Sequence, residues 1–160
     1  VLGLEYLQTL MLKITPLQTK IHESELERAS NSYLMSLLAM FIGLPFPIMN
    51  LVSTLIFFFG NKKASAFVRW HCSQALLTQI TLFIFNTLSF WWTIGILTGE
   101  FNLSNYYFAY LSFVILLNCT EIIQTIISST QIRKRKQVRW FFYGTLVDLL
   151  HNKPSNEQVN

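Results

Sequence analysis

Charged side chains are almost absent from a long central stretch, and this feature limits the fold more than any other. Between residues 29 and 132 the charged residues are Lys62, Lys63, Arg69, Glu100 and Glu121. Soluble domains carry about a quarter charged residues, whereas this chain of 160 residues has 12% charged and 52% hydrophobic residues. So little polar surface excludes a soluble enzyme, a disordered tail and a basic nucleic-acid binder. We therefore expect a lipid bilayer to surround most of the chain.

Three apolar runs predict an all-α, polytopic membrane protein with three transmembrane helices, at about residues 33–59, 72–97 and 106–128. As a straight helix the first run would be about 40 Å long, more than the roughly 30 Å of hydrocarbon. Pro45 and Pro47 break it, because each proline removes a backbone donor. We expect one kinked span, since the arms of a hairpin would reach only part of the way across. A re-entrant hairpin remains the alternative.

Amphipathic segments flank the membrane domain. The apolar stretch at 1–13 is too short to span a bilayer and is ended by Pro16, so we expect an interfacial helix there. Asn31 or Ser32 is expected to cap the first span. Residues 138–150 predict a second interfacial helix, followed by a solvated tail. We divide the chain into a polar N-terminal segment (1–30), a three-span domain (31–130) and a basic C-terminal segment (131–160).

Basic residues predict the orientation of the chain. The N-terminal side holds three of the twelve Lys and Arg, namely Lys13, Lys20 and Arg28, and the other nine follow the first or the last span. The positive-inside rule then places the Lys62 loop and the C-terminus in the cytoplasm, and three crossings place the N-terminus outside. A basic block next to a span is expected to bind anionic lipid rather than nucleic acid. The expected headgroup contacts are Lys62, Lys63, Arg133, Lys134, Arg135, Lys136 and Arg139.

Polar residues inside the spans form two stripes at helical spacing, one on each of the last two spans. Glu121 is the single acidic residue within a span, and an ionised carboxylate there costs a few kcal/mol, so it needs a partner. We expect that partner to be Gln74 or His71, with Arg69 approaching from the interface. Two interpretations of these stripes remain. They form a proton-titrating or substrate-facing pathway, or they form structural hydrogen bonds between the spans. The proposed helix-interface site comprises Arg69, His71, Gln74, Asn118, Glu121 and Gln124.

No catalytic, cofactor or metal site is predicted. His71 and Cys72 are adjacent on a helix, so their side chains diverge by about 100°, and further ligands do not follow. Cys72 and Cys119 are expected to pack as small apolar side chains. Neither a nucleophile elbow nor a phosphate-binding glycine loop is present in the sequence.

A motif at the start of the second span carries a family resemblance. Arg69, His71, Gln74, Ala75 and Leu76 fit the pattern Arg-aromatic-His-x-x-Gln-Ala-Leu, which follows a proline-broken run and a basic turn. This order resembles a widespread bacterial family of small, uncharacterised membrane proteins. That family is distantly similar to the channel-type Tic subunit of the chloroplast protein import machinery. The resemblance implies a helical membrane fold and a role in protein translocation or membrane-complex assembly.

We therefore expect a non-enzymatic integral subunit of a larger complex in the bacterial inner membrane, acting in protein translocation or its assembly, whose partners are other membrane subunits and anionic lipids. Two alternatives remain. One is a small channel or carrier with a polar pathway around Glu121, and the other is a membrane organiser that binds anionic lipid through its basic block.

Overall fold

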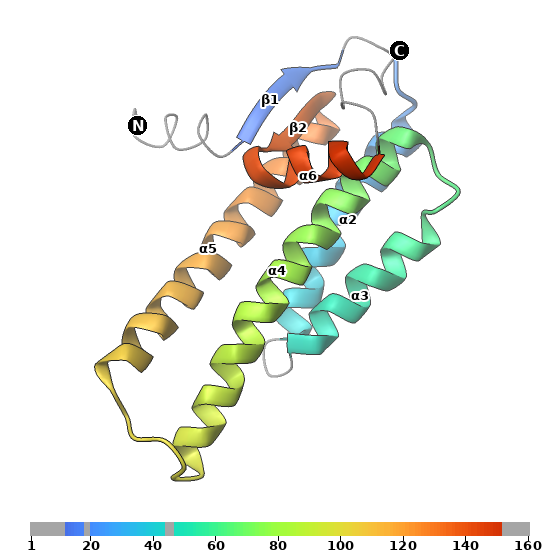
Figure 1. The fold of residues 1–160 in the computed structure, drawn as a ribbon. Helices are drawn as coiled ribbons and strands as arrows, with labels where there is room; N and C mark the ends of the chain where they lie inside the picture. The colour runs from blue at the N-terminus through green and yellow to red at the C-terminus, as the bar shows by residue number, and fades with distance from the viewer. Residues whose placement is uncertain (1–11, 18–19, 44–46, 152–160) are drawn as a thin grey trace.

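The computed structural model describes residues 12–17, 20–43 and 47–151, and within these residues the protein is mainly helical (Figure 1). Helices α2 and α3 form a hairpin beside one half of the long helices α4 and α5. Two short strands and α6 lie at that same end, and the α4–α5 loop lies at the other. The elements are β1 (Leu12–Pro16), α2 (Glu23–Gly43), α3 (Pro47–Gly60), α4 (Ala66–Leu97), α5 (Asn105–Arg133), β2 (Lys136–Trp140) and α6 (Phe141–His151).

Helices α4 and α5 are long and apolar enough to cross a membrane. They have 32 and 29 residues, or about 48 and 44 Å of helix. Each begins at a serine N-cap, because the side chains of Ser65 and Ser104 accept hydrogen bonds from the first-turn N–H groups of Val68 and Tyr107. The predicted spans at 72–97 and 106–128 are thus correctly placed but too short.

The predicted single span over residues 33–59 is wrong, and three transmembrane helices are not supported. The run divides into α2 and α3, which pack against each other and against α4. The helices end and begin around the two prolines, where the backbone donors are missing. The expected cap is also wrong, because Ser32 lies inside α2 and donates to the carbonyl of Ala29 at 2.7 Å. Two short arms are stable here since each one packs on a long helix and need not cross alone.

The strands β1 and β2 join the two ends of the described chain. They pair antiparallel, with Leu12 opposite Trp140 and Ile14 opposite Val138. The predicted helix at 1–13 lies mostly outside the described residues, and its last two residues belong to a strand. The predicted helix at 138–150 is also corrected, because α6 begins only at Phe141. This pairing contradicts an N-terminal segment on the far side of the membrane, because β1 is bound to the strand that follows α5.

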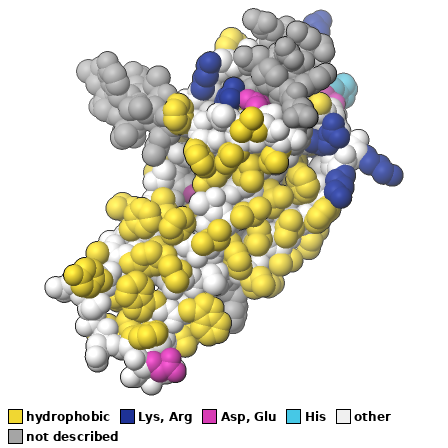
Figure 2. Space-filling view, in the orientation of Figure 1, with side chains coloured by type: hydrophobic (Ala, Val, Ile, Leu, Met, Phe, Trp, Pro, Cys, Tyr) yellow, Lys and Arg dark blue, Asp and Glu magenta, His cyan; other side chains and the backbone are white. Residues whose placement is uncertain are grey.

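The two ends of the molecule differ in charge. In the described residues every Lys and Arg lies near the strand pair, in the α3–α4 turn, or in the adjoining helix ends. Dark blue side chains accordingly gather at this end in Figure 2, and an acidic side chain marks the opposite end. The α4–α5 loop carries Glu100 and no basic residue. Between the ends the surface is apolar, with Ile84, Leu116 and Ile123 each more than half exposed.

Candidate functional site

A buried polar cluster lies directly beneath the strand pair. Gln74 of α4 donates from Nε2 to the Tyr33 hydroxyl at 2.7 Å, and its Oε1 accepts from the Trp140 backbone N–H at 3.2 Å. The Tyr33 hydroxyl lies 3.0 Å from His71 Nδ1. The Tyr33 hydroxyl therefore contacts both Gln74 and His71. The cluster ties α2, α4 and β2 together, and Gln74 is its central member.

His71 is otherwise enclosed by aromatic rings. The rings of Phe67 and Trp70 meet it edge-on, with centroid distances of 4.6 and 4.9 Å. Its Nε2 atom is buried without a hydrogen-bond partner. Tyr33 stacks on Trp140 with centroids 6.0 Å apart, so β2 closes this cluster from above.

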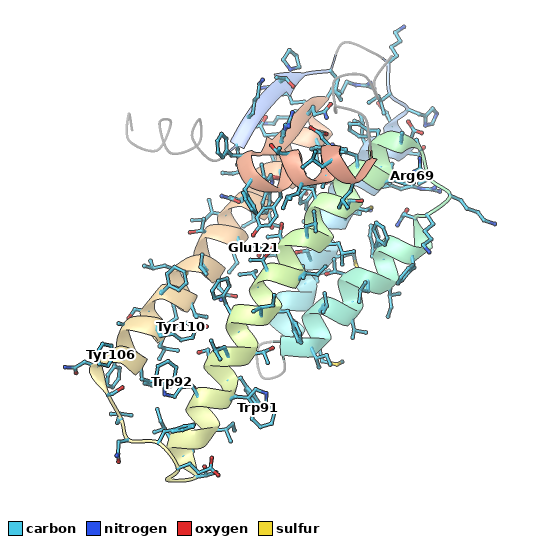
Figure 3. The ribbon with its side chains drawn as sticks, in the orientation of Figure 1. Arg69, Trp91, Trp92, Tyr106, Tyr110 and Glu121 are labelled. Atoms are coloured by element: carbon cyan, nitrogen blue, oxygen red, sulfur yellow. The ribbon has the colours of Figure 1, made fainter. Side chains whose placement is uncertain are left out.

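Glu121 stands at the centre of a second, deeper cluster (Figure 3). Its Oε1 accepts three hydrogen bonds, from Gln79 Nε2 at 2.6 Å, Ser36 Oγ at 3.1 Å and Thr125 Oγ1 at 3.1 Å. Gln79 also donates to Ser36. All four side chains are buried. One carboxylate oxygen therefore connects α2, α4 and α5, the three helices from which the donors and the acceptor come.

Two acceptors in this cluster remain unused. Glu121 Oε2 and Gln79 Oε1 are buried and have no hydrogen-bond partner. Measured along α5, Glu121 lies about 18 Å from Arg133 and about 21 Å from Tyr107. The cluster thus sits near the middle of the helix, at a depth where an unpaired polar atom is costly.

The predicted partners of Glu121 are wrong. Gln74 and His71 belong to the shallower cluster, and Arg69 is exposed at the start of α4. The actual partners are Ser36 of the first apolar run and Gln79 of the second, and neither is among the residues that the sequence predicts for this site. A signal was present: Ser30, Tyr33 and Ser36 recur at a spacing of three, which puts hydroxyl groups on one side of α2.

The remaining predicted residues are separate from Glu121. Asn118 exchanges hydrogen bonds with Asn86 of α4 at 2.8 and 3.2 Å, and both side chains are half-buried. Gln124 is half-buried on α5. The six residues predicted as one site therefore occupy at least three places along the helices.

The basic block is partly structural. Arg133 donates from Nε to Ser30 at 3.0 Å, which in turn lies 2.8 Å from the Ser129 hydroxyl. Arg139 forms an ion pair with Asp148 at 2.7 Å, and the indole N–H of Trp70 donates to the same carboxylate at 2.8 Å. Arg135 pairs with an exposed glutamate at 3.4 Å. The lysines of the predicted headgroup set are exposed, namely Lys62, Lys63, Lys134 and Lys136.

Aromatic rings mark two levels along the long helices. Trp70 lies near one end of α4, and Trp91 and Trp92 lie near the other, where Trp92 contacts Tyr110 of α5 and Trp91 points away from α5 (Figure 3). Trp70 and Trp91 are separated by about 32 Å of helix, close to the roughly 30 Å of a hydrocarbon core. Exposed rings such as Trp91 settle at the interface of a bilayer, whereas Trp70 is buried inside the protein. The apolar exterior, the buried polar interior and two helices long enough to cross a membrane are features of a helical membrane protein.

The chain belongs to the magnetosome magnetite crystal formation protein family, which it matches over residues 29–147. This is a family of small, magnetosome-associated bacterial membrane proteins. The match confirms the predicted small bacterial membrane family and leaves the Tic resemblance a prediction. No curated protein and no solved structure matches the chain. Among the described residues, no group of three or more His, Cys, Asp or Glu side chains could hold a metal ion.

Proposed function

We propose that this chain is a non-enzymatic subunit of a complex in the magnetosome membrane, acting in the transport of other proteins into that membrane or in their assembly there. Family membership supports the membrane and its link to crystal formation. The argument for a partner rests on one observation, the half-buried Asn86–Asn118 pair between α4 and α5.

The amide pair argues for a partner because of where it lies. Asn86 lies about 10 Å farther along α4 than Gln79, near the level of the end of α2, and the amide pair is nevertheless only half-buried. Amide groups exposed to hydrocarbon are costly, and polar residues in spans usually face protein. Ile115, on the same side of α5 as Asn118, is 54% exposed. A transmembrane helix of another subunit would cover both residues.

Photo-crosslinking tests the partner. A photoreactive amino acid at Ile115 is expected to crosslink to another membrane protein when the tagged chain replaces the native copy in its own bacterium. The matched control is Ile56 on α3, which is 68% exposed and is expected to crosslink mainly to lipid. Equal crosslinking to the same proteins from both positions would argue against a specific interface at the amide pair.

A transport role has its own test. Deletion of the gene is expected to remove particular proteins from isolated magnetosome membranes, and the wild-type chain is expected to restore them. An unchanged membrane proteome together with altered crystals would refute transport while leaving the family role in place.

We propose that the end carrying the strand pair faces the cytoplasm. Every described Lys and Arg lies at this end, which is the asymmetry that the positive-inside rule uses. Reporters fused to the N-terminus, into the Lys62 turn and to the C-terminus should all be cytoplasmic, and a reporter at Asn102 should lie on the other side. A cytoplasmic reporter at Asn102 would contradict this orientation.

A small channel or carrier is the second candidate. It is favoured by the two unpartnered acceptors, Glu121 Oε2 and Gln79 Oε1, at mid-depth. Flux of protons or small cations into proteoliposomes should then fall when Glu121 is changed to Gln. Unchanged flux in that variant would exclude the pathway.

Anionic lipid is the second partner that we propose. The exposed lysines at the cytoplasmic end would bind anionic headgroups, each contributing about 1 kcal/mol. Salt-sensitive binding to phosphatidylglycerol in nanodiscs, weakened by Lys134→Gln and Lys136→Gln, is the expected result. Binding that ignores both salt and these substitutions would oppose it.

A further inference from the structure

The described chain occupies the two halves of the membrane unequally. Helices α4 and α5 run the full length of the bundle, whereas the hairpin of α2 and α3 lies beside the part next to the strand pair and stops short of the α4–α5 loop (Figure 1). Helix α3 has 14 residues, or about 21 Å, and the apolar part of α2 at 33–43 is about 16 Å long. Neither arm reaches the far side of a roughly 30 Å core.

Helix α6 adds to the same side. It lies across the bundle at the end that holds the strand pair. The side chain of Val147 on α6 is fully buried. Asp148 of α6 accepts a hydrogen bond from Trp70 and forms an ion pair with Arg139. The opposite face of α6 is apolar and exposed. It consists of Phe141, Phe142, Leu149 and Leu150, which are 79%, 66%, 70% and 68% exposed.

This face fits the interface of a bilayer. An amphipathic helix in that position buries its apolar side in the boundary between headgroups and acyl chains, and its binding depends on membrane curvature. The exposed Lys62, Lys63, Lys134 and Lys136 lie at the same end, so the apolar face of α6 is accompanied by cations that suit a headgroup layer. A lipid surface is thus the occupant of this face.

We propose that the protein is a membrane wedge, with a preference for bilayers whose leaflet on the strand-pair side is convex. A helix with its side chains is about 10 Å wide. In the described residues, α6 and the hairpin add area mainly on the strand-pair side, and only α4 and α5 continue to the far end of the bundle. A convex leaflet has its lipid headgroups spread apart and takes up the additional area.

The wedge is independent of the proposed partner. A partner helix that crosses the whole membrane adds about the same area to both leaflets and leaves their difference unchanged. Curvature preference is therefore a property of this chain, and its failure would leave the partner proposal intact.

Sorting between flat and curved membrane tests the wedge. The full chain, with a fluorescent protein after Asn160, is reconstituted into giant vesicles of phosphatidylcholine alone, so that lipid charge cannot concentrate it. Narrow tethers are then pulled, and the ratio of protein to lipid fluorescence in the tether is compared with that of the parent vesicle. Quenching by an impermeant reagent reports which way each population of molecules faces.

The two orientations provide opposite expectations from the same protein. Molecules whose C-terminal end faces outward should be enriched severalfold in the tether, because the outer leaflet is convex there. Molecules facing inward should be depleted by a similar factor. Equal ratios in both orientations would overturn the proposal, whatever their size.

A pair of variants separates the wedge from general hydrophobicity. Phe142→Gln with Leu149→Gln removes apolar area from the exposed face of α6 and should reduce the enrichment. The matched control is Leu97→Gln with Leu103→Gln, at the opposite end, where both side chains are also exposed, by 78% and 62%. This control should keep or increase the enrichment. An equal reduction in both variants, each with unchanged helix content by circular dichroism, would refute the assigned role of α6.

Discussion

Replacing Glu121 with alanine should destabilise the membrane domain far more than replacing it with glutamine. In the wild-type protein one carboxylate oxygen accepts hydrogen bonds from Ser36, Gln79 and Thr125. Alanine leaves all three donors buried without that acceptor. Glutamine has a side chain of the same length as glutamate, so its carbonyl oxygen remains as an acceptor for these donors. Its NH2 group takes the place of Glu121 Oε2, which has no partner.

The size of the effect follows from the number of donors. Interhelical hydrogen bonds in membranes contribute about 0.6 kcal/mol each, and an unsatisfied buried donor costs about 1–3 kcal/mol. Gln79 and Ser36 bond each other, which moderates the loss. We expect Glu121→Ala to lower the free energy of unfolding by about 2–4 kcal/mol and Glu121→Gln by less than about 1 kcal/mol.

Reversible unfolding in mixed micelles with increasing sodium dodecyl sulfate, followed by fluorescence of the four tryptophans, measures both values. The matched control is Glu100→Ala in the exposed α4–α5 loop, where the change should stay within about 0.5 kcal/mol. Similar losses for Glu121→Ala and Glu121→Gln would refute the idea that the accepting oxygen holds the three helices together. A negligible loss for Glu121→Ala would refute the cluster itself.

Three further predictions concern the strand-pair end and the far loop. Trp140→Phe should cost about 1 kcal/mol of stability by removing the indole donor to Ser128 at 2.7 Å. Lys13→Cys with Arg139→Cys should form a disulfide on mild oxidation in a cysteine-free background, because the two positions are directly opposite; a lack of crosslinking would contradict the register. Gly99→Ala should lower the melting temperature, since φ is +81° there, and an unchanged value would count against that turn.

The sequence was sufficient for the class of the protein and for the two long helices. The scarcity of charge between residues 29 and 132 excluded water as the solvent, and runs of apolar residues located α4 and α5 to within a few residues. These features are local and depend on composition, so they can be predicted without knowing the tertiary contacts. The basic turn and the basic block lie at one end of the molecule, together with Lys13, Lys20 and Arg28, which the three-span prediction places on the other side.

The path of the first apolar run could not be deduced in the same way. Pro45 and Pro47 indicate a break, but they do not determine whether the chain continues across the membrane or turns back. That choice depends on what the two arms contact. Here α2 packs on α4 and α5, α3 packs on α4, and β1 pairs with β2. The sequence does not predict the strand pair, because the alternating pattern of a five-residue strand is too short to be distinguished from an amphipathic helix.

The same distinction between sequence and tertiary structure applies to the polar site around Glu121. The sequence by itself determined that Glu121 lies within a span and needs hydrogen-bond donors, because a charged or polar group in hydrocarbon is costly wherever it stands. Only the tertiary structure decided that those donors are Ser36 and Gln79. A turn back at the two prolines brings α2 into contact with α4 and α5. The spacing of polar residues within one helix does not indicate which other helix those residues will contact.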